Sequence, residues 1–158
     1  MQKRMSYGRA ATMLMFAMLA APSANAATPA ELKAAKSYVE GIYAKLPGDF
    51  DYRSVRYAPA LKALIAKEDA CAVAESGICV IDTVPFCDCQ DTGTDYKIVS
   101  STVTALGKTG ARVTVAMRNG GPVRYSVDLT LARGVWYVAD IATPTTKSFV
   151  AKLREGLK

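Results

Sequence analysis

The sequence predicts an α+β fold in which N-terminal helices pack on a curved four-stranded antiparallel sheet and a short helix ends the chain. Up to about residue 69, apolar residues recur every three or four positions, which is typical of amphipathic helices. After residue 96 the period changes to two, which is typical of half-buried strands, and tight-turn signals separate the strand segments. Because the helices must cover the apolar face of such a sheet, we expect residues 27–158 to form one domain.

Residues 1–26 have the pattern of a secretory signal peptide. Lys3, Arg4 and Arg9 give a basic start, a mostly apolar run covers 10–21, and an Ala-Asn-Ala cleavage sequence ends at Ala26. The run is shorter than the roughly 20 residues that span a bilayer, so cleavage is favoured over a membrane anchor. We therefore expect a mature protein without a membrane span, in the periplasm or outside the cell.

Composition excludes several classes of function. The chain carries 20 Lys+Arg and 14 Asp+Glu, but three of the bases lie in the signal segment, so the mature part has 17 bases against 14 acids, a net charge of +3. This charge includes no basic block and gives little support to nucleic-acid binding. The chain has no histidine, which excludes Ser-His-Asp and Cys-His catalysis and every metal site built on histidine. No cofactor is expected.

Two helices are expected before the sheet. The first covers about residues 29–46, because Thr28, Pro29 and Glu31 form a capping box with proline at the first helical position, and Pro47-Gly48 ends it. The second covers roughly 55–69, with Pro59 tolerated only in its first turn. The apolar stripe of the first helix consists of Leu32, Ala35, Val39, Ile42, Tyr43 and Leu46.

The sheet is expected to be a meander closed by a short helix. In its last strand Trp136 and Val138 are expected on one face, with Ile141 on the other. Thr145 or Thr146 is expected to cap the final helix. The four strand segments are 96–105, 111–118, 123–131 and 135–143, separated by turn signals at 107–110, 119–121 and 133–134.

Three short motifs carry a family resemblance: residues 82–86 (Asp-Thr-Val-Pro-Phe), Gln90-Asp91, and 134–141 (Gly-Val-Trp-Tyr-Val-Ala-Asp-Ile). With the order of elements, they make roughly residues 30–155 similar to the secreted bacterial proteins grouped as domain-of-unknown-function family 3828. This resemblance implies a cystatin-like, cone-shaped α+β fold similar to nuclear transport factor 2. It implies no settled activity, and it does not include Cys87-Asp88-Cys89.

Four cysteines, Cys71, Cys79, Cys87 and Cys89, predict two disulfides in an exported chain. Three connectivities are possible. Pairing Cys87 with Cys89 would close a very small ring with sharp backbone geometry. We therefore favour bonding Cys71 and Cys79 each to one of the other two, which would fasten the helical half to the sheet.

No metal is expected at these residues. A zinc site of four thiolates lacks the usual two-residue ligand spacings, and the expected compartment oxidises thiols. A calcium loop counted from Asp88 lacks its closing glutamate, because the twelfth position is Val99. Turn-forming and helix-capping roles are the favoured interpretation of the acidic residues in this stretch.

A cone pocket is one candidate functional site. Cone-shaped folds often open a pocket between sheet and helices. Asp140 could act there as a general base, with Tyr125 or Tyr137 as a proton donor, since burial raises a carboxyl pKa. The favoured interpretation is that both tyrosines pack and that Asp140 bonds the backbone at a strand end.

The second candidate site is a basic face. Arg112, Arg118 and Arg124 share the polar side of the second hairpin and could meet an acidic protein or an anionic envelope component. A solvated sheet face is the plainer interpretation.

The sequence favours a non-catalytic periplasmic binding or protective protein, whose partner is a protein or an envelope component. An inhibitor or immunity protein against a secreted effector is a specialised version. The alternative is a small-molecule enzyme or carrier that uses a cone pocket with Asp140 and a tyrosine. A deep pocket with Asp140 inside would favour the alternative, and a filled core with an exposed patch would favour binding. The sequence predicts neither the partner nor the oligomeric state.

Overall fold

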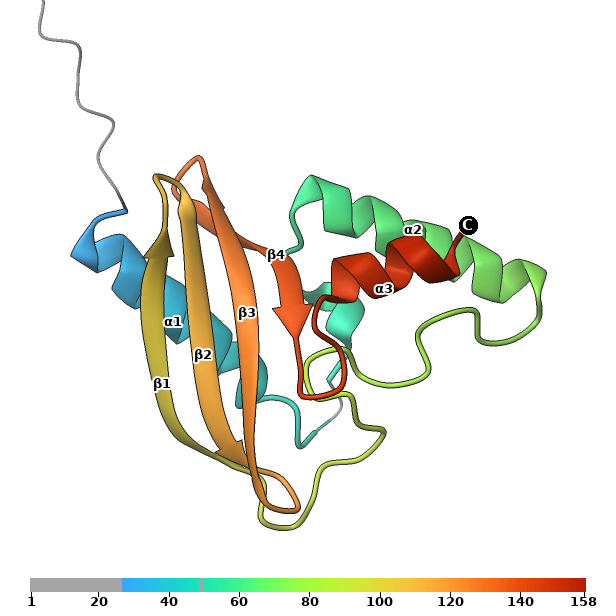
Figure 1. Cartoon of the computed structure of the whole chain (residues 1–158), viewed down its shortest axis with the longest axis horizontal. Helices are drawn as coiled ribbons and strands as arrows, with labels where there is room; N and C mark the ends of the chain where they lie inside the picture. Colours follow the sequence, from blue (N-terminus) through green and yellow to red (C-terminus); the bar gives the residue numbers. More distant parts are fainter. Residues whose placement is uncertain (1–26, 49) are drawn as a thin grey trace, which may run out of the picture.

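The computed structural model describes residues 27–48 and 50–158 (Figure 1). The predicted signal peptide lies outside these residues. Within them no helix is both long and apolar enough to cross a membrane. The fold is the predicted α+β arrangement, with helices before a four-stranded antiparallel sheet and a short helix after it. The elements are α1 (Pro29–Tyr43), the 3-10 helix η1 (Tyr52–Ser54), α2 (Pro59–Ala74), β1 (Lys97–Leu106), β2 (Gly110–Arg118), β3 (Pro122–Ala132), β4 (Val135–Ala142) and α3 (Phe149–Gly156).

Helix α1 begins with the predicted capping box. The Thr28 hydroxyl accepts a hydrogen bond from Glu31 N at 3.2 Å, and the Glu31 carboxylate accepts one from Thr28 N at 2.7 Å. The bond from Thr28 N, and next a 2.8 Å bond that the Thr28 hydroxyl donates to the Glu31 carboxylate, lower the pKa of Glu31. The helix ends at Tyr43, three residues before the expected end, because the chain then continues as a turn. Its apolar stripe packs against β1 and β2.

Helix α2 begins at Pro59, later than expected, because the residues before it pair with the sheet. Ala58 N donates to Val138 O at 2.8 Å, and Val138 N donates to Arg56 O at 2.8 Å. This short parallel pairing covers the free edge of β4. Proline without an N–H can then open the helix, which runs on through the alanine-rich segment to Ala74.

The sheet has the strand order β1-β2-β3-β4. Strands β2 and β3 are joined by a tight turn in which Gly120 and Gly121 have positive φ values of 69° and 140°. Alternate residues on these strands face the core, as the period of two predicts. The buried residues of the two strands are Ala111, Val113, Val115, Met117, Tyr125, Val127 and Leu129.

A β-bulge in β4 corrects one expectation. The pairing with β3 changes from Asp128 opposite Asp140 to Leu129 opposite Val138, which leaves Ala139 as an extra residue. The alternation of faces shifts by one at that point. As a result Ile141 is buried like Trp136 and Val138, and is not on the opposite face as the strict period of two predicted.

Helix α3 is capped by Ser148 and not by Thr145 or Thr146. The Ser148 hydroxyl accepts a hydrogen bond from Ala151 N at 3.0 Å. The two threonines instead turn their hydroxyls to Asp88. The predicted final helix is present, with its start fixed by a different side chain.

The helices cover different parts of the sheet (Figure 1). Helix α1 crosses one face of β1, β2 and β3, whereas α2 and α3 lie side by side next to β4. One core cluster fills the space between these layers and includes side chains from every helix and from β2, β3 and β4. The opposite face of β1, β2 and β3, which we call the outer face, carries the polar side chains of the strands.

Candidate functional site

The three side chains proposed for a cone pocket do not meet in one site. Tyr125 is buried on the core face of β3, where it lies under α1. Tyr137 is opposite Thr130 and half-buried, between the buried residues Trp136 and Val138. Asp140 is opposite Asp128, beyond the bulge. The strand alternation therefore separates Tyr125 from the other two.

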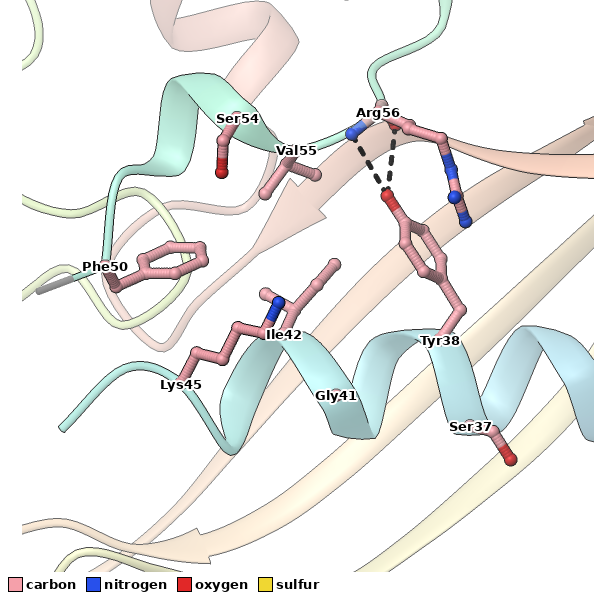
Figure 2. Close-up of a pocket in the computed structure, with 9 residues that line it drawn as sticks. All are labelled: Ser37, Tyr38, Gly41, Ile42, Lys45, Phe50, Ser54, Val55 and Arg56. Atoms are coloured by element: carbon pink, nitrogen blue, oxygen red, sulfur yellow. Dashed lines mark hydrogen bonds between the residues drawn. The ribbon is translucent and has the colours of Figure 1, made fainter. Parts of the chain in front are cut away.

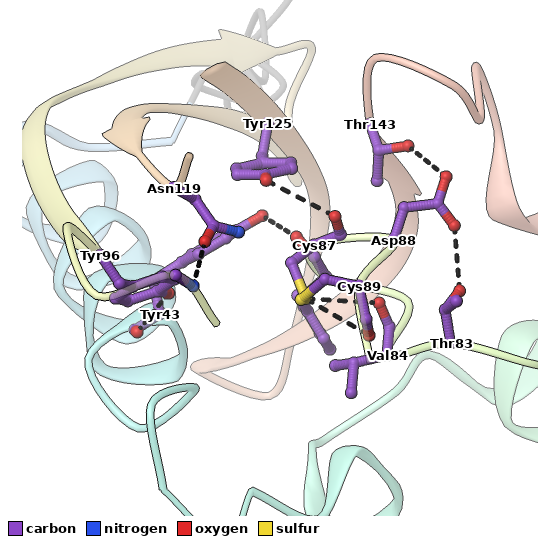
Figure 3. The surroundings of a disulfide bond; sticks show 12 residues. Tyr43, Thr83, Val84, Cys87, Asp88, Cys89, Tyr96, Asn119, Tyr125 and Thr143 are labelled. Atoms are coloured by element: carbon purple, nitrogen blue, oxygen red, sulfur yellow. Dashed lines mark hydrogen bonds between the residues drawn. A yellow bond between two sulfur atoms is a disulfide. The ribbon is translucent and has the colours of Figure 1, made fainter. Parts of the chain in front are cut away.

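Tyr125 has a packing role. Its ring stacks on that of Tyr43, with ring centroids 5.5 Å apart, and its hydroxyl lies 3.5 Å from Cys87 O (Figure 3). Burial raises its pKa, so the hydroxyl stays protonated at neutral pH. Tyr43 bonds the same loop, donating to Phe86 O at 3.0 Å. Both tyrosines thus tie the sheet and α1 to the segment that precedes the sheet.

Asp140 holds the start of α3. Its Oδ1 accepts hydrogen bonds from Ile141 N at 2.8 Å and Val150 N at 3.0 Å. Its Oδ2 accepts one from the Ser148 hydroxyl at 2.6 Å. Three bonds of this kind occupy the carboxylate with backbone and cap, so Asp140 orients the turn between β4 and α3.

The disulfides join Cys71 to Cys79 and Cys87 to Cys89, and not the cross-pairs that we favoured. We had disfavoured the Cys87–Cys89 bond because its small ring requires a sharply bent backbone. Asp88, between the two cysteines, provides that bend with a φ of 53°, and a hydrogen bond from Val84 N to Cys89 O at 2.9 Å closes the turn around it. Neither disulfide therefore fastens the helices to the sheet.

Asp88, inside the small ring, joins its loop to the chain that follows β4 (Figure 3). Its Oδ1 accepts from the Thr83 hydroxyl at 3.0 Å, and its Oδ2 accepts from Thr143 at 3.1 Å. Thr145 and Thr146, in the same turn after β4, also donate to Oδ2. The loop is thus bound to the turn between β4 and α3. In the described part of the chain, no group of three or more acidic or cysteine side chains could hold a metal ion.

The predicted basic face divides into a neutralised part and a free part. Arg112 and Asp128 form a bidentate pair across β2 and β3, with nitrogen–oxygen distances of 2.6 and 2.7 Å. This pair raises the pKa of Arg112 and leaves little net charge there. Arg118 and Arg124 form no ion pair with any described residue.

A shallow hollow of about 660 Å³ lies beside the free arginines, on the outer face at the end of the sheet near the β2–β3 turn. Lys97, opposite Arg118 on the neighbouring strand, contributes a third cation. The rest of the lining is apolar and includes Ala116 and Val99. Val99 is 60% exposed because it is the extra residue of a bulge in β1. The hollow therefore combines three positive charges with apolar surface.

A second hollow, of about 410 Å³, lies between α1 and the chain that leads to α2 (Figure 2). Two of its polar residues, Tyr38 and Arg56, contact each other. The Tyr38 hydroxyl accepts from Arg56 N at 3.1 Å, and the Arg56 guanidinium lies 4.3 Å from the centre of the Tyr38 ring. Lys45 and Phe50 form the other end. These contacts fix the connector against α1, which is a structural role.

Comparison with known proteins gives no further assignment, since no family model, curated protein or solved structure matches this chain. Membership of the family that the sequence resembles therefore stays a prediction.

Sequence reasoning found Arg118 and Arg124 but missed Lys97 and Val99. Lys97 joins the site only through the register of β1 against β2, and Val99 is exposed only because of the bulge. In the sequence, Lys97 is followed by a run of uncharged residues within a predicted strand. That contrast could have drawn attention to Lys97 as an isolated cation at the end of the sheet.

Proposed function

We propose that this protein is an exported, non-catalytic binding protein that receives an acidic protein segment in the hollow lined by Lys97, Arg118 and Arg124. The proposal rests on one observation, which is that these cations differ from Arg112 in having no ion-pair partner within the part of the chain that the structure describes. On the same face, Arg112 is neutralised by Asp128, whereas the three cations around the hollow lack a carboxylate partner among the described residues.

The surroundings of the hollow support this interpretation. Asp95, at the same end of the sheet, directs its Oδ1 to Gly120 N at 2.7 Å, so this oxygen is engaged by the β2–β3 turn. Cations placed together without a partner repel one another, and an incoming carboxylate relieves that repulsion. Exposed Val99 adds apolar contact beside the charges, and arginine with apolar surface is typical of protein interfaces.

The shape of the site favours a protein segment over a membrane. A flat bilayer surface is best contacted by protruding basic and aromatic side chains. Here the cations line a depression, and none of the residues that line it is aromatic. A narrow acidic element can enter such a depression. Export is supported by the two disulfides, which persist in oxidising compartments.

A labelled oligoglutamate peptide tests the proposal by fluorescence anisotropy. Binding is expected at low salt and should weaken as salt rises. The double variant Arg118→Ser/Arg124→Ser should weaken binding by about tenfold, since each exposed charge contributes up to about 1 kcal/mol. The matched control is Lys67→Ser/Lys108→Ser, which also removes two exposed positive charges, both outside the hollow.

Three results would contradict the proposal. The first is wild-type protein that does not bind the peptide at low salt. The second is an equal loss of binding in the double variant and in Lys67→Ser/Lys108→Ser, which would indicate attraction by net charge alone. The third is tighter binding to vesicles of anionic phospholipid than to the peptide.

A further inference from the structure

The two edges of the sheet differ. At the β4 edge, residues 56–58 supply main-chain hydrogen bonds to Val138. At the β1 edge, no strand or bridge in the described part of the chain pairs with the outward backbone groups. Figure 1 shows β1 at the open side of the sheet, with α1 on its face and not along its edge. About every second one of the ten residues of β1 therefore presents unpaired N–H and C=O groups to the surroundings, since the groups of the residues between them bond β2.

This edge lacks the usual protection against pairing. Natural edge strands carry charges, prolines or bulges that stop another strand from adding. Residues 98–107 contain no charged side chain and no proline. The protective features, Lys97 and the bulge at Val99, stand at one end only. The remaining seven residues, Ser100–Leu106, are regularly paired with β2 and are rich in residues that favour strands.

Exposed apolar side chains mark the same edge. Of the four large hydrophobic side chains that are exposed in the described structure, two belong to β1: Val99 at 60% and Leu106 at 41%. They lie near opposite ends of the regular segment. Leu106 shares the outer face with Ser100, Thr102 and Thr104, because these residues alternate along a strand without a bulge.

We propose that β1 pairs antiparallel with β1 of a second copy of this chain, around a two-fold axis at Val103. Residues opposite each other in such a pair must share a face, which this register satisfies. Ser100 then lies opposite Leu106, and Thr102 opposite Thr104. Val99 of each copy comes next to Leu106 of the other, so the two exposed apolar side chains of the strand cover each other. The product is a continuous eight-stranded sheet.

A second copy fits this edge better than a charged peptide. The uncharged segment offers nothing that selects a charged partner, whereas its threonines and valines suit an identical strand. Lys97 and Lys108 flank the segment, so repulsion opposes pairing beyond Ser100–Leu106. Salt screens that repulsion. Association of copies should therefore strengthen with salt, the opposite of the response expected for the acidic partner.

Sedimentation velocity of the mature protein, over a range of concentrations and at low and high salt, tests this inference. The wild type is expected to dimerise, more strongly at high salt. Thr102→Lys places a charge in the centre of the seam and should reduce association by tenfold or more. Thr130→Lys adds the same charge to the outer face two strands away and should leave association unchanged. Circular dichroism checks that both variants fold.

Amide hydrogen exchange provides a second measurement on the same samples. Protection of residues 100–106 should rise with concentration in the wild type and stay constant in Thr102→Lys. A wild type that remains monomeric at its solubility limit would overturn the inference. A dimer that persists in Thr102→Lys, or whose concentration-dependent protection lies outside β1, would overturn it equally.

Discussion

Trp136 Nε1 donates a hydrogen bond to the main-chain oxygen of Glu31 at 2.9 Å, which connects residues 105 positions apart. Glu31 lies in the first turn of α1, and Trp136, the only tryptophan, is buried in β4. Because α1 packs mainly on β1 and β2, this bond ties the start of the helix to the other end of the sheet. Trp136 thus closes α1 over the core.

Replacing Trp136 with Phe should therefore destabilise the fold. The change removes the N–H donor and part of a buried ring, which together cost about 1 to 3 kcal/mol. Urea unfolding followed by circular dichroism measures the loss. Tyr137→Phe is the control, since Tyr137 is the next residue along β4 and is only half-buried. This control variant should change the free energy of unfolding by less than about 1 kcal/mol. Equal losses in both variants would contradict the assigned role.

The disulfide pairing predicts a specific peptide map. Cleavage after Asp69, Glu75, Asp82, Asp88 and Asp91 places each cysteine in a separate peptide. Residues 70–75 should be found joined to 76–82 by Cys71 and Cys79, and residues 83–88 should be found joined to 89–91 by Cys87 and Cys89. Mass spectrometry without reduction checks this. A bond from residues 70–75 to either 83–88 or 89–91 would support the cross-pairing expected from the sequence.

What the sequence could predict follows from how local each signal is. The capping box of Thr28 and Glu31 and the position of Pro59 depend on neighbouring residues, and the structure confirms them. The extra residues Val99 and Ala139 leave no mark in a period-two pattern, because strand-favouring residues continue through them. The faces and exposure after each bulge were therefore not predictable.

The candidate site was predictable in part for the same reason. Arg118 and Arg124 fall on the polar side of their strands, as the alternation predicts. The neutralisation of Arg112 depends on its register opposite Asp128. The small cysteine ring depends on the left-handed backbone at Asp88, which residues other than glycine adopt less readily.

Glu68 gives a prediction about a buried carboxylate. It is 2% exposed, and its Oε1 accepts hydrogen bonds from Val80 N at 2.8 Å and Ile81 N at 2.9 Å. Its Oε2 is buried without a partner among the described residues. Glu68→Ala would leave these two backbone N–H groups without an acceptor and should lower the free energy of unfolding by about 2 to 4 kcal/mol. Chemical denaturation measures the difference in the free energy of unfolding.

Glu68→Gln separates the hydrogen bonds from the charge. The amide oxygen can still accept from Val80 N and Ile81 N, and the buried charge is removed. This variant should lie within about 1 kcal/mol of the wild type. A loss in Glu68→Gln as large as in Glu68→Ala would mean that the charge itself stabilises the loop.

Buried tyrosines should make the fold sensitive to alkali. Tyr43 is fully buried, and burial raises its pKa well above the ordinary value of 10.0; Tyr57 is raised by burial in the same way. When the pH rises above 10, the unfolded chain loses these protons and the folded chain keeps them. The unfolded state then gains stability, so the free energy of unfolding falls by up to about 1.4 kcal/mol per pH unit for each such tyrosine.

Tyr43→Phe tests this sign directly. At neutral pH the variant should be less stable by about 1 kcal/mol, because Phe86 O loses its donor. Above pH 10 the variant has one fewer ionisable group in the unfolded state, so its stability should fall less steeply than that of the wild type. The two curves of unfolding free energy against pH should therefore converge and then cross. Parallel curves would show that Tyr43 ionises as readily in the folded protein as in the unfolded chain, which its burial against Tyr125 and Phe86 argues against.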